Sequence, residues 1–199
     1  MKLLVFLFLF LSPTFNLNYK KMTMPYSIVI SKADLIVDGT VSKVFKNTYE
    51  FTISQFVKGK SGSKINVSIW KEWLCDPRIG ELKAGQRLIL FLEKTPSGNF
   101  NPINESTGEL YIDKDSFTNI YIAKDFSSPT VLKKGIRMFL ETYTVQADLK
   151  DPFSQTIYFQ KSIFEIYKMK EENKFFKFLV DKELAYSNAK YNSTYQFND

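Results

Sequence analysis

The chain has 199 residues, of which 44% are hydrophobic and 16% aromatic, so it can bury a core as one domain, with or without an appendage. Its formal net charge is +6, but the lysines are interspersed with Asp and Glu, so we expect no nucleic-acid binding. It has no histidine and one cysteine, which excludes His-dependent catalytic triads, Cys/His zinc sites and an intrachain disulfide, and we expect no metal or cofactor.

The N-terminus has the pattern of a secretory signal peptide. Lys2 precedes an unbroken apolar run over residues 3–11, which ends at Ser12 and Pro13. Nine residues of helix are about 13 Å long, against roughly 30 Å of bilayer hydrocarbon, so this run is too short to span a membrane. No later segment is apolar enough to do so. We therefore expect removal of residues 1–16 and export of the mature protein to the periplasm or outside the cell.

Residues 33–125 follow a period of two, which predicts short strands separated by polar turns. Gly39, inside the first strand, indicates a bulge or a point of coiling. The continuous apolar run at 88–92 predicts a deeply buried strand, and the last two core strands are expected to form a hairpin around residues 106–108. The expected strands are 35–45, 49–54, 64–69, 88–92, 100–103 and 110–112, with an edge strand at 117–122.

The pattern changes to helical spacing after residue 125. Ser128 and Pro129 are typical of a helix start, and apolar residues follow at helical intervals to Tyr143. We expect a linker at 147–152, two more helices at 156–172 and 174–188, and a frayed tail at 191–199. The apolar residues that these two helices are expected to bury are Ile157, Ile163, Phe164 and Tyr167 in the first, and Phe175, Phe178, Leu179 and Leu184 in the second.

These elements predict an α+β protein, an OB-like small antiparallel β-barrel followed by a C-terminal helical extension. The expected division is a signal peptide at 1–16, the barrel domain at 17–126 and the extension, packed on the barrel, at 127–199.

The strand region resembles the superfamily of netrin modules and tissue inhibitors of metalloproteinases. The Ala-Asp pair that opens residues 33–41 is similar to the start of that family's long first strand, and residues 51–59 resemble its second strand with a Lys-Gly turn. Residues 82–92 are similar to its Gly-Gln-x-(Leu/Tyr)-Leu-x-Phe strand, which many bacterial exported proteins share. In those bacterial proteins, a segment like 104–113 follows.

This resemblance covers a little under half of the chain and implies an OB-like barrel, in agreement with the strand count. It does not extend to the known inhibitory mechanism. In the metalloproteinase inhibitors, an N-terminal cysteine chelates the protease zinc and disulfides hold it to the barrel, whereas no cysteine precedes Cys75 here. We therefore do not expect inhibition by zinc chelation.

The longest connection of the predicted barrel runs from residue 70 to residue 85. Trp70, Lys71, Trp73 and Arg78 lie on it and are the candidate partner-binding residues, because exposed aromatic side chains beside cations suit a binding surface. The alternative, which we favour, is that the two tryptophans close the barrel end as part of the core. Cys75, in the same segment, is expected to be a small buried hydrophobe rather than a reactive thiol.

Several carboxylates share a strand face. Glu109, Asp113 and Asp115 alternate, which is compatible with a cation site or an acid pair, although a solvated strand face explains them better. Asp34 and Asp38 have the same two interpretations.

Two further patterns have an ordinary structural explanation. Residues 59–61 resemble the end of a phosphate-binding loop, but the glycine required at position 54 is a serine, so we predict a hairpin turn. The aromatic residues of the last two helices, with interspersed lysines, could lie on a membrane or a partner, but we favour packing on the barrel.

The sequence therefore favours an exported, non-catalytic binding module whose partner is a protein or a cell-envelope component. Two alternatives stay open. One is a protease inhibitor that does not chelate zinc, and the other is a carbohydrate-active enzyme that uses carboxylates alone.

Overall fold

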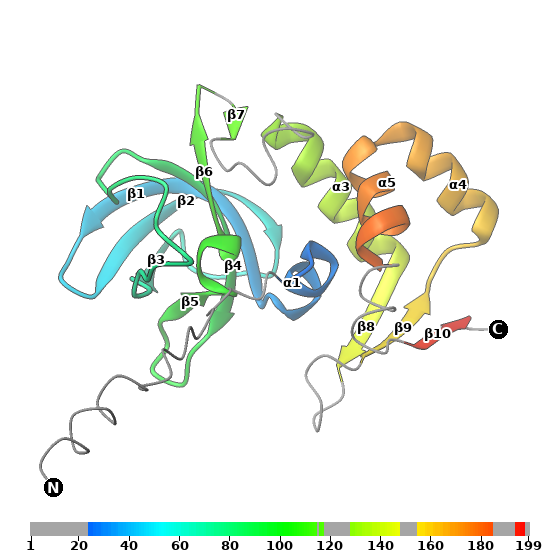
Figure 1. The fold of residues 1–199 in the computed structure, drawn as a ribbon, viewed down its shortest axis with the longest axis horizontal. Helices are drawn as coiled ribbons and strands as arrows, with labels where there is room; N and C mark the ends of the chain where they lie inside the picture. The colour runs from blue at the N-terminus through cyan, green and yellow to red at the C-terminus, as the bar shows by residue number, and fades with distance from the viewer. Residues whose placement is uncertain (1–23, 115, 118–127, 148–154, 185–193, 198–199) are drawn as a thin grey trace, which may run out of the picture.

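The computed structural model describes residues 24–114, 116–117, 128–147, 155–184 and 194–197. The barrel stands on one side of the molecule and α3, α4 and α5 on the other, with α1 between them (Figure 1). The elements are α1 Tyr26–Lys32, β1 Leu35–Val44, β2 Thr48–Lys58, β3 Lys64–Ser68, β4 Arg87–Lys94, β5 Phe100–Pro102, the 3₁₀ helix η1 Glu105–Gly108, β6 Glu109–Asp113, β7 Ser116–Phe117, α3 Pro129–Thr142, β8 Tyr143–Ala147, β9 Gln155–Phe159, α4 Ile163–Glu172, α5 Lys174–Phe178, the π-helix η2 Leu179–Leu184 and β10 Thr194–Phe197.

Five strands form a small closed barrel. Their order is β1-β2-β3-β5-β4, and pairing of β1 with β4 closes the sheet on itself. All these pairs are antiparallel except β3 with β5, which pair in parallel at Val67 and Phe100. The predicted fold class, an OB-like barrel followed by C-terminal helices, is confirmed.

Strand β4 is buried on both faces, as its continuous apolar run predicts. Leu88, Leu90 and Leu92 lie in the barrel interior. Ile89 and Phe91 point outward, into a second core that the barrel shares with the helices. A strand covered on both sides has no polar face, which explains why this segment does not alternate.

Gly39 marks an irregularity in β1, which confirms the prediction. The pairing register of β1 with β2 shifts between Asp38 and Gly39. A Cβ atom at Gly39 would lie 2.2 Å from the carbonyl oxygen of Thr52 and 2.8 Å from the ring of Phe51. Only glycine lets β2 approach β1 this closely.

The predicted hairpin between residues 100–103 and 110–112 is wrong. Both β5 and β6 pair with β4, β5 near Leu92 and β6 near Leu90, along the edge of β4 that faces away from β1. They act as one interrupted strand. Asn104 and Glu105 adopt positive φ angles of 51° and 58°, and the η1 turn that they begin interrupts the pairing.

The short helix α1 before β1 has no counterpart in the sequence-based prediction. Lys58, at the end of β2, donates from Nζ to the carbonyl oxygens of Ile30 and Ser31, both at 2.9 Å. The hydroxyl of Tyr26 donates to the carbonyl of Thr107 at 3.1 Å. These bonds join α1 to the barrel at both of its ends.

The C-terminal part differs from the prediction in two segments, residues 155–159 and 194–197. Helix α3 begins after Ser128, as predicted, but the helix expected from residue 156 is wrong, because residues 155–159 form β9. Strand β9 pairs with β8 on one side and with β10 on the other, so residues 194–197 of the expected frayed tail are also a strand. Predictions for residues 1–16, 118–122, 148–152 and 185–188 lie outside the described residues.

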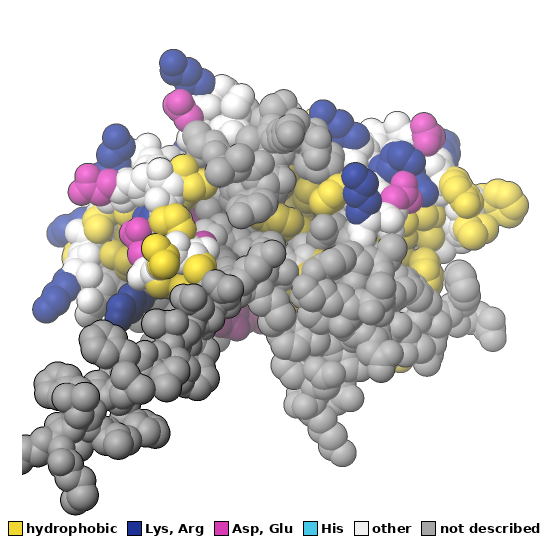
Figure 2. Space-filling view, viewed as in Figure 1, with side chains coloured by type: hydrophobic (Ala, Val, Ile, Leu, Met, Phe, Trp, Pro, Cys, Tyr) yellow, Lys and Arg dark blue, Asp and Glu magenta, His cyan; other side chains and the backbone are white. Residues whose placement is uncertain are grey.

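Helix α4 buries little of its apolar surface. Ile163, Phe164 and Tyr167, all expected to be buried, are 53%, 83% and 61% exposed, so this prediction is wrong. Ile166 is the buried residue of the helix. Figure 2 shows hydrophobic side chains at the edge of the molecule where Figure 1 draws α4.

Asp38 links the barrel to helix α3. Its carboxylate accepts hydrogen bonds from Lys133 Nζ of α3 at 2.5 Å and from Arg87 of β4 at 3.0 Å, and Lys133 also donates to Gln55 at 2.7 Å. Asp38 is 2% exposed, so the expected solvated position is wrong. Burial opposes its ionisation, but the hydrogen bonds from Arg87 and Lys133 outweigh burial and lower the pKa of Asp38 below its usual value.

Candidate functional site

The connection from β3 to β4, residues 69–86, is named here the Trp loop because it contains both tryptophans of the chain, Trp70 and Trp73. It is the longest link between consecutive barrel strands. Part of it is fixed to the barrel interior and part projects outward.

Glu109 fixes the inner part of the Trp loop. It pairs with Leu90, whose side chain faces the barrel interior, so Glu109 points inward from β6. Its buried carboxylate accepts three hydrogen bonds, from Tyr49 Oη at 2.8 Å, from Trp70 Nε1 at 2.7 Å and from Arg78 Nη1 at 2.5 Å. Two of the three donors come from the Trp loop.

Arg78 is held from several sides, beyond the turn of the loop at residues 74–75. Its guanidinium lies 4.3 Å from the ring centroid of Trp70, and its side chain is only 4% exposed. The backbone N–H of Arg78 donates to Glu72 Oε2 at 3.0 Å, and Nε lies 3.4 Å from Glu72 Oε1. Arg78 is therefore an internal ion-pair partner of Glu109 and not an exposed cation.

The electrostatics of this cluster follow from burial. Burial raises the pKa of Glu109, and the charge of Arg78 with the hydrogen bonds from Trp70 and Tyr49 opposes that rise. Burial, together with the nearby Glu109 carboxylate, raises the pKa of Tyr111 to about 12. Both oxygens of Glu109 already have donors, which suits an anchor better than a catalytic acid.

A second attachment holds the middle of the Trp loop to η1. Asp76 is 4% exposed and accepts hydrogen bonds from both the backbone N–H, at 3.2 Å, and the hydroxyl of Ser106. Trp73 Nε1 donates to Glu105 Oε2 at 3.1 Å, and the carbonyl of Trp73 accepts from Asp76 N at 3.0 Å. The tip of the loop is thereby fixed on both sides of residues 74–75.

Between these attachments, the Trp loop exposes apolar side chains. Leu74 is 95% exposed, Ile79 is 45% exposed and Trp73 is 36% exposed. Cys75 is also exposed, so the expectation of a buried thiol is wrong. Exposed leucine at this level is unfavourable in water, and the loop cannot fold it inward because its flanks are attached to the barrel.

The structure divides the four candidate binding residues into two pairs. Trp70 and Arg78 lie in the Glu109 cluster, where Trp70, 9% exposed, closes the barrel as the core alternative predicts. Lys71 and Trp73 are exposed, so the favoured alternative is wrong for Trp73. The sequence interpretation did not single out Leu74 and Ile79, and the sequence alone does not distinguish them from Ile69 and Leu82 of the same loop, which are partly buried.

The carboxylates expected to share a solvated face do not do so. Glu109 is buried and Asp113 is exposed, while Asp115 lies outside the described residues, so the expectation is wrong for Glu109. Asp34 is exposed, and its Oδ2 accepts from the backbone N–H of Lys94 at 2.7 Å.

Neither the known protein families nor the curated proteins contain a sequence that matches this chain. Within the described ranges, no three metal-ligating side chains come together, and none of the helices there is long and apolar enough to cross a bilayer.

Proposed function

We propose that this protein is a non-catalytic binding module that contacts a protein partner through the exposed apolar side chains of the Trp loop. The observation that carries the proposal is the 95% exposure of Leu74 on a loop fixed by a buried ion pair and a buried aspartate. When a partner covers an apolar side chain that its own scaffold holds in water, the burial of that side chain stabilises the complex. Trp73 and Ile79 extend the same surface, and large apolar residues surrounded by polar ones are typical of interface hot spots.

The charges around this surface favour a protein partner with both charge signs. Lys71 and Glu72 are exposed next to Trp73, so an apolar centre has a polar rim of mixed sign. Such a rim suits the surface of a folded protein better than a uniformly charged polymer.

The proposal places this contact outside the cytoplasm. It rests on the apolar run at residues 3–11, and N-terminal sequencing of the native protein tests it by showing whether residues 1–16 are missing. The resemblance of the barrel strands to netrin modules and metalloproteinase inhibitors supports an extracellular binding role. The only cysteine is the exposed Cys75, so the partner would be bound without the zinc-chelating N-terminus of those inhibitors.

Leu74→Ser tests the surface directly. Leu74 is almost fully exposed, so the change should leave the free energy of unfolding within about 0.5 kcal/mol of wild type. Cross-linking of the wild-type protein in its native envelope should capture a partner. With both proteins purified, the affinity of Leu74→Ser for that partner should be about tenfold or more below that of the wild type.

Phe164→Ser is the matched control, because it removes an 83% exposed apolar side chain from α4. It should retain full affinity. Binding that survives Leu74→Ser, or that Phe164→Ser weakens to the same extent, contradicts the proposal.

A further inference from the structure

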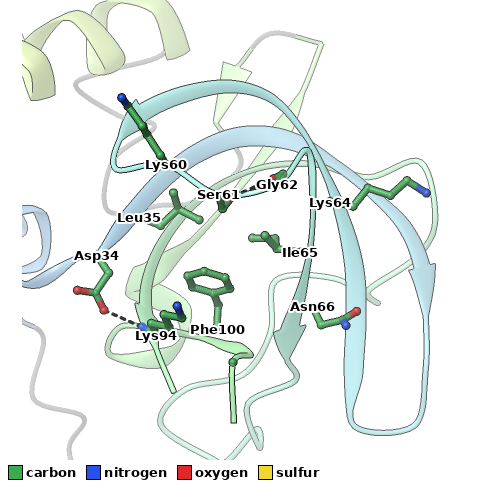
Figure 3. Close-up of a pocket in the computed structure, with 11 residues that line it drawn as sticks. Asp34, Leu35, Lys60, Ser61, Gly62, Lys64, Ile65, Asn66, Lys94 and Phe100 are labelled. Atoms are coloured by element: carbon green, nitrogen blue, oxygen red, sulfur yellow. Dashed lines mark hydrogen bonds between the residues drawn. The ribbon is translucent and has the colours of Figure 1, made fainter. Parts of the chain in front are cut away.

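A separate pocket lies at the other end of β3 and β4. The Trp loop joins the end of β3 to the start of β4, whereas this pocket is bounded by the start of β3 and the end of β4. Its volume is about 430 Å³, within the range of about 300–1,000 Å³ that small-molecule sites occupy. Leu35, Ile65 and Phe100 face its centre (Figure 3).

The rim of the pocket is basic and polar. Lys60, Lys64 and Lys94 line it and are exposed, and Figure 3 shows Lys60 and Lys64 on opposite sides with their ammonium groups pointing away from the pocket. Ser61 and Asn66 add a hydroxyl and an amide. Long lysine side chains on flexible stems can turn over such a mouth when an anion occupies it.

Only one acid lines the pocket, and its carboxylate already has a donor. Asp34 accepts from the backbone N–H of Lys94 at 2.7 Å, as Figure 3 shows. Lys64 pairs with Glu50 at 3.0 Å, but both of these side chains are substantially exposed. The rim therefore has an excess of positive charge, which attracts anions and repels cations.

The shape of the pocket is fixed by two glycine turns. Gly59 has a φ of +74° and lies so close to Asp34 that a Cβ would be 2.2 Å from the Asp34 carbonyl oxygen. Gly98 has a φ of +85° in the β4–β5 turn, where the N–H of Thr95 donates to the carbonyl of Asn99 at 2.9 Å. The walls are formed by backbone that is already ordered, so a ligand meets a preformed site.

We infer that this pocket binds an acidic sugar residue, with the ligand's carboxylate between the rim lysines and its hydroxyl groups on Ser61 and Asn66. The Asn66 amide can donate to and accept from sugar hydroxyls, and the Ser61 hydroxyl, which donates to the Gly62 carbonyl at 2.9 Å, can accept from them. Ammonium groups recognise the carboxylate through charge-assisted hydrogen bonds. Phe100 at the floor is 8% exposed, so it offers the sugar only a small apolar contact and the polar groups provide most of the recognition.

Titration of the whole chain with glucuronate, glucose and inorganic sulfate, followed by amide NMR shifts, tests this inference. Glucuronate should shift the amides of Ser61, Gly62 and Gly98. Glucose and sulfate should each bind with an affinity at least about tenfold lower, a difference of about 1.4 kcal/mol in binding free energy. Glucose that binds equally well overturns recognition of the charge, and sulfate that binds equally well overturns recognition of the sugar. Absence of shifts at these amides with glucuronate overturns the site.

A pair of charge-matched variants separates this site from the general effect of net charge. Lys60→Gln with Lys94→Gln removes two rim charges and should weaken glucuronate binding about tenfold, since each charge-assisted bond is lost. Lys46→Gln with Lys83→Gln removes two exposed charges from the other end of the barrel and should leave the affinity unchanged. Equal weakening in both double variants overturns the inference. All four lysines are exposed, so both double variants should fold.

Discussion

Glu109 shows at the level of a single residue why a pattern of alternation does not reveal burial. A period of two establishes that residues 109, 111 and 113 share one face of β6, but not which face the core covers. Leu110 and Ile112, on the other face, are buried against the helices, while Glu109 and Tyr111 point into the barrel. Both faces are covered, so the charged residue type at position 109 wrongly suggests that this side chain is exposed to solvent. Its true environment depends on Arg78, thirty-one residues away in the chain.

Glu109→Gln should be strongly destabilising. It leaves the Arg78 guanidinium buried without its counter-charge, and breaking a buried ion pair in this way costs about 3–5 kcal/mol. Glu72→Gln removes the other carboxylate next to Arg78, but Glu72 is 52% exposed, so that change should cost at most about 1 kcal/mol. Urea unfolding of both variants measures the difference, and similar losses would contradict the assigned roles.

Asp38 should make the protein lose stability in acid. Its pKa in the folded state is below its usual value of 3.8, so ionised Asp38 favours the folded state above that pH. This contribution is lost as the pH falls from 3.8 through the lower folded-state pKa, because the folded form must then bind a proton that the unfolded form already holds.

Asp38→Asn should therefore show a smaller dependence of the unfolding free energy on pH between about 2 and 4 than the wild type. Urea unfolding at a series of pH values measures it. An equal dependence in the two proteins would show that Arg87 and Lys133 do not favour the ionised carboxylate.

At the scale of elements, the close approach of β1 and β2 predicts the effect of one substitution. Gly39→Ala forces a Cβ to within 2.2 Å of the Thr52 carbonyl, so the strands must separate, at a cost of about 1–3 kcal/mol. Gly80→Ala, in the Trp loop, has no atom within 4 Å of the new Cβ and should change stability by less than about 0.5 kcal/mol. Thermal unfolding of the two variants is the measurement, and a neutral Gly39→Ala would refute the argument.

The sequence predicts the barrel strands well because each is alternating or continuously apolar and is bounded by turn residues. The pairing of β5 and β6 is harder to predict from the sequence, since two short apolar segments around a turn have the same pattern whether they pair with each other or with a third strand. The pairing registers show that β4 is the common partner, and the chain turns between β5 and β6 at Asn104 and Glu105, whose positive φ angles the residue types do not require.

The start of α4 could have been recognised. Ser162 and Glu165 form a capping box, in which the serine side chain accepts from the Glu165 N–H and the glutamate accepts from the Ser162 N–H at 2.9 Å. A helix that begins at an N-cap at Ser162 cannot continue from residue 156. Residues 155–159 are then a separate segment, and their β-branched and aromatic residues suit a strand. The exposure of Phe164 has no such signal, because helical periodicity alone does not say whether a neighbour covers the apolar face.

At the scale of the whole molecule, the helices and the barrel share a core. Ile136 of α3 and Phe91 of β4 belong to the same buried cluster, and Lys133 joins Asp38 across the same boundary. The two parts should therefore unfold in one cooperative transition.

Ile136→Ala tests this coupling, because both tryptophans are in the barrel and report on it alone. The variant should lose about 2–5 kcal/mol of stability. Its tryptophan fluorescence and its far-ultraviolet circular dichroism should shift to lower urea concentration together. Fluorescence that keeps its wild-type midpoint would show that the barrel unfolds independently of α3.

Barrel closure also has a consequence for how fast the chain folds. Leu35 pairs with Leu92, so β1 cannot pair with β4 until β2, β3 and the whole Trp loop, which lie between them in the chain, have been ordered or looped out. Contacts this distant in sequence require loop closure before they contribute any stability, which lowers folding rates to the range of milliseconds to seconds for topologies rich in such pairs. Strands β1 and β2, by contrast, are joined by a three-residue turn and can form early. The closing seam between β1 and β4 is therefore the part of the barrel that should form last.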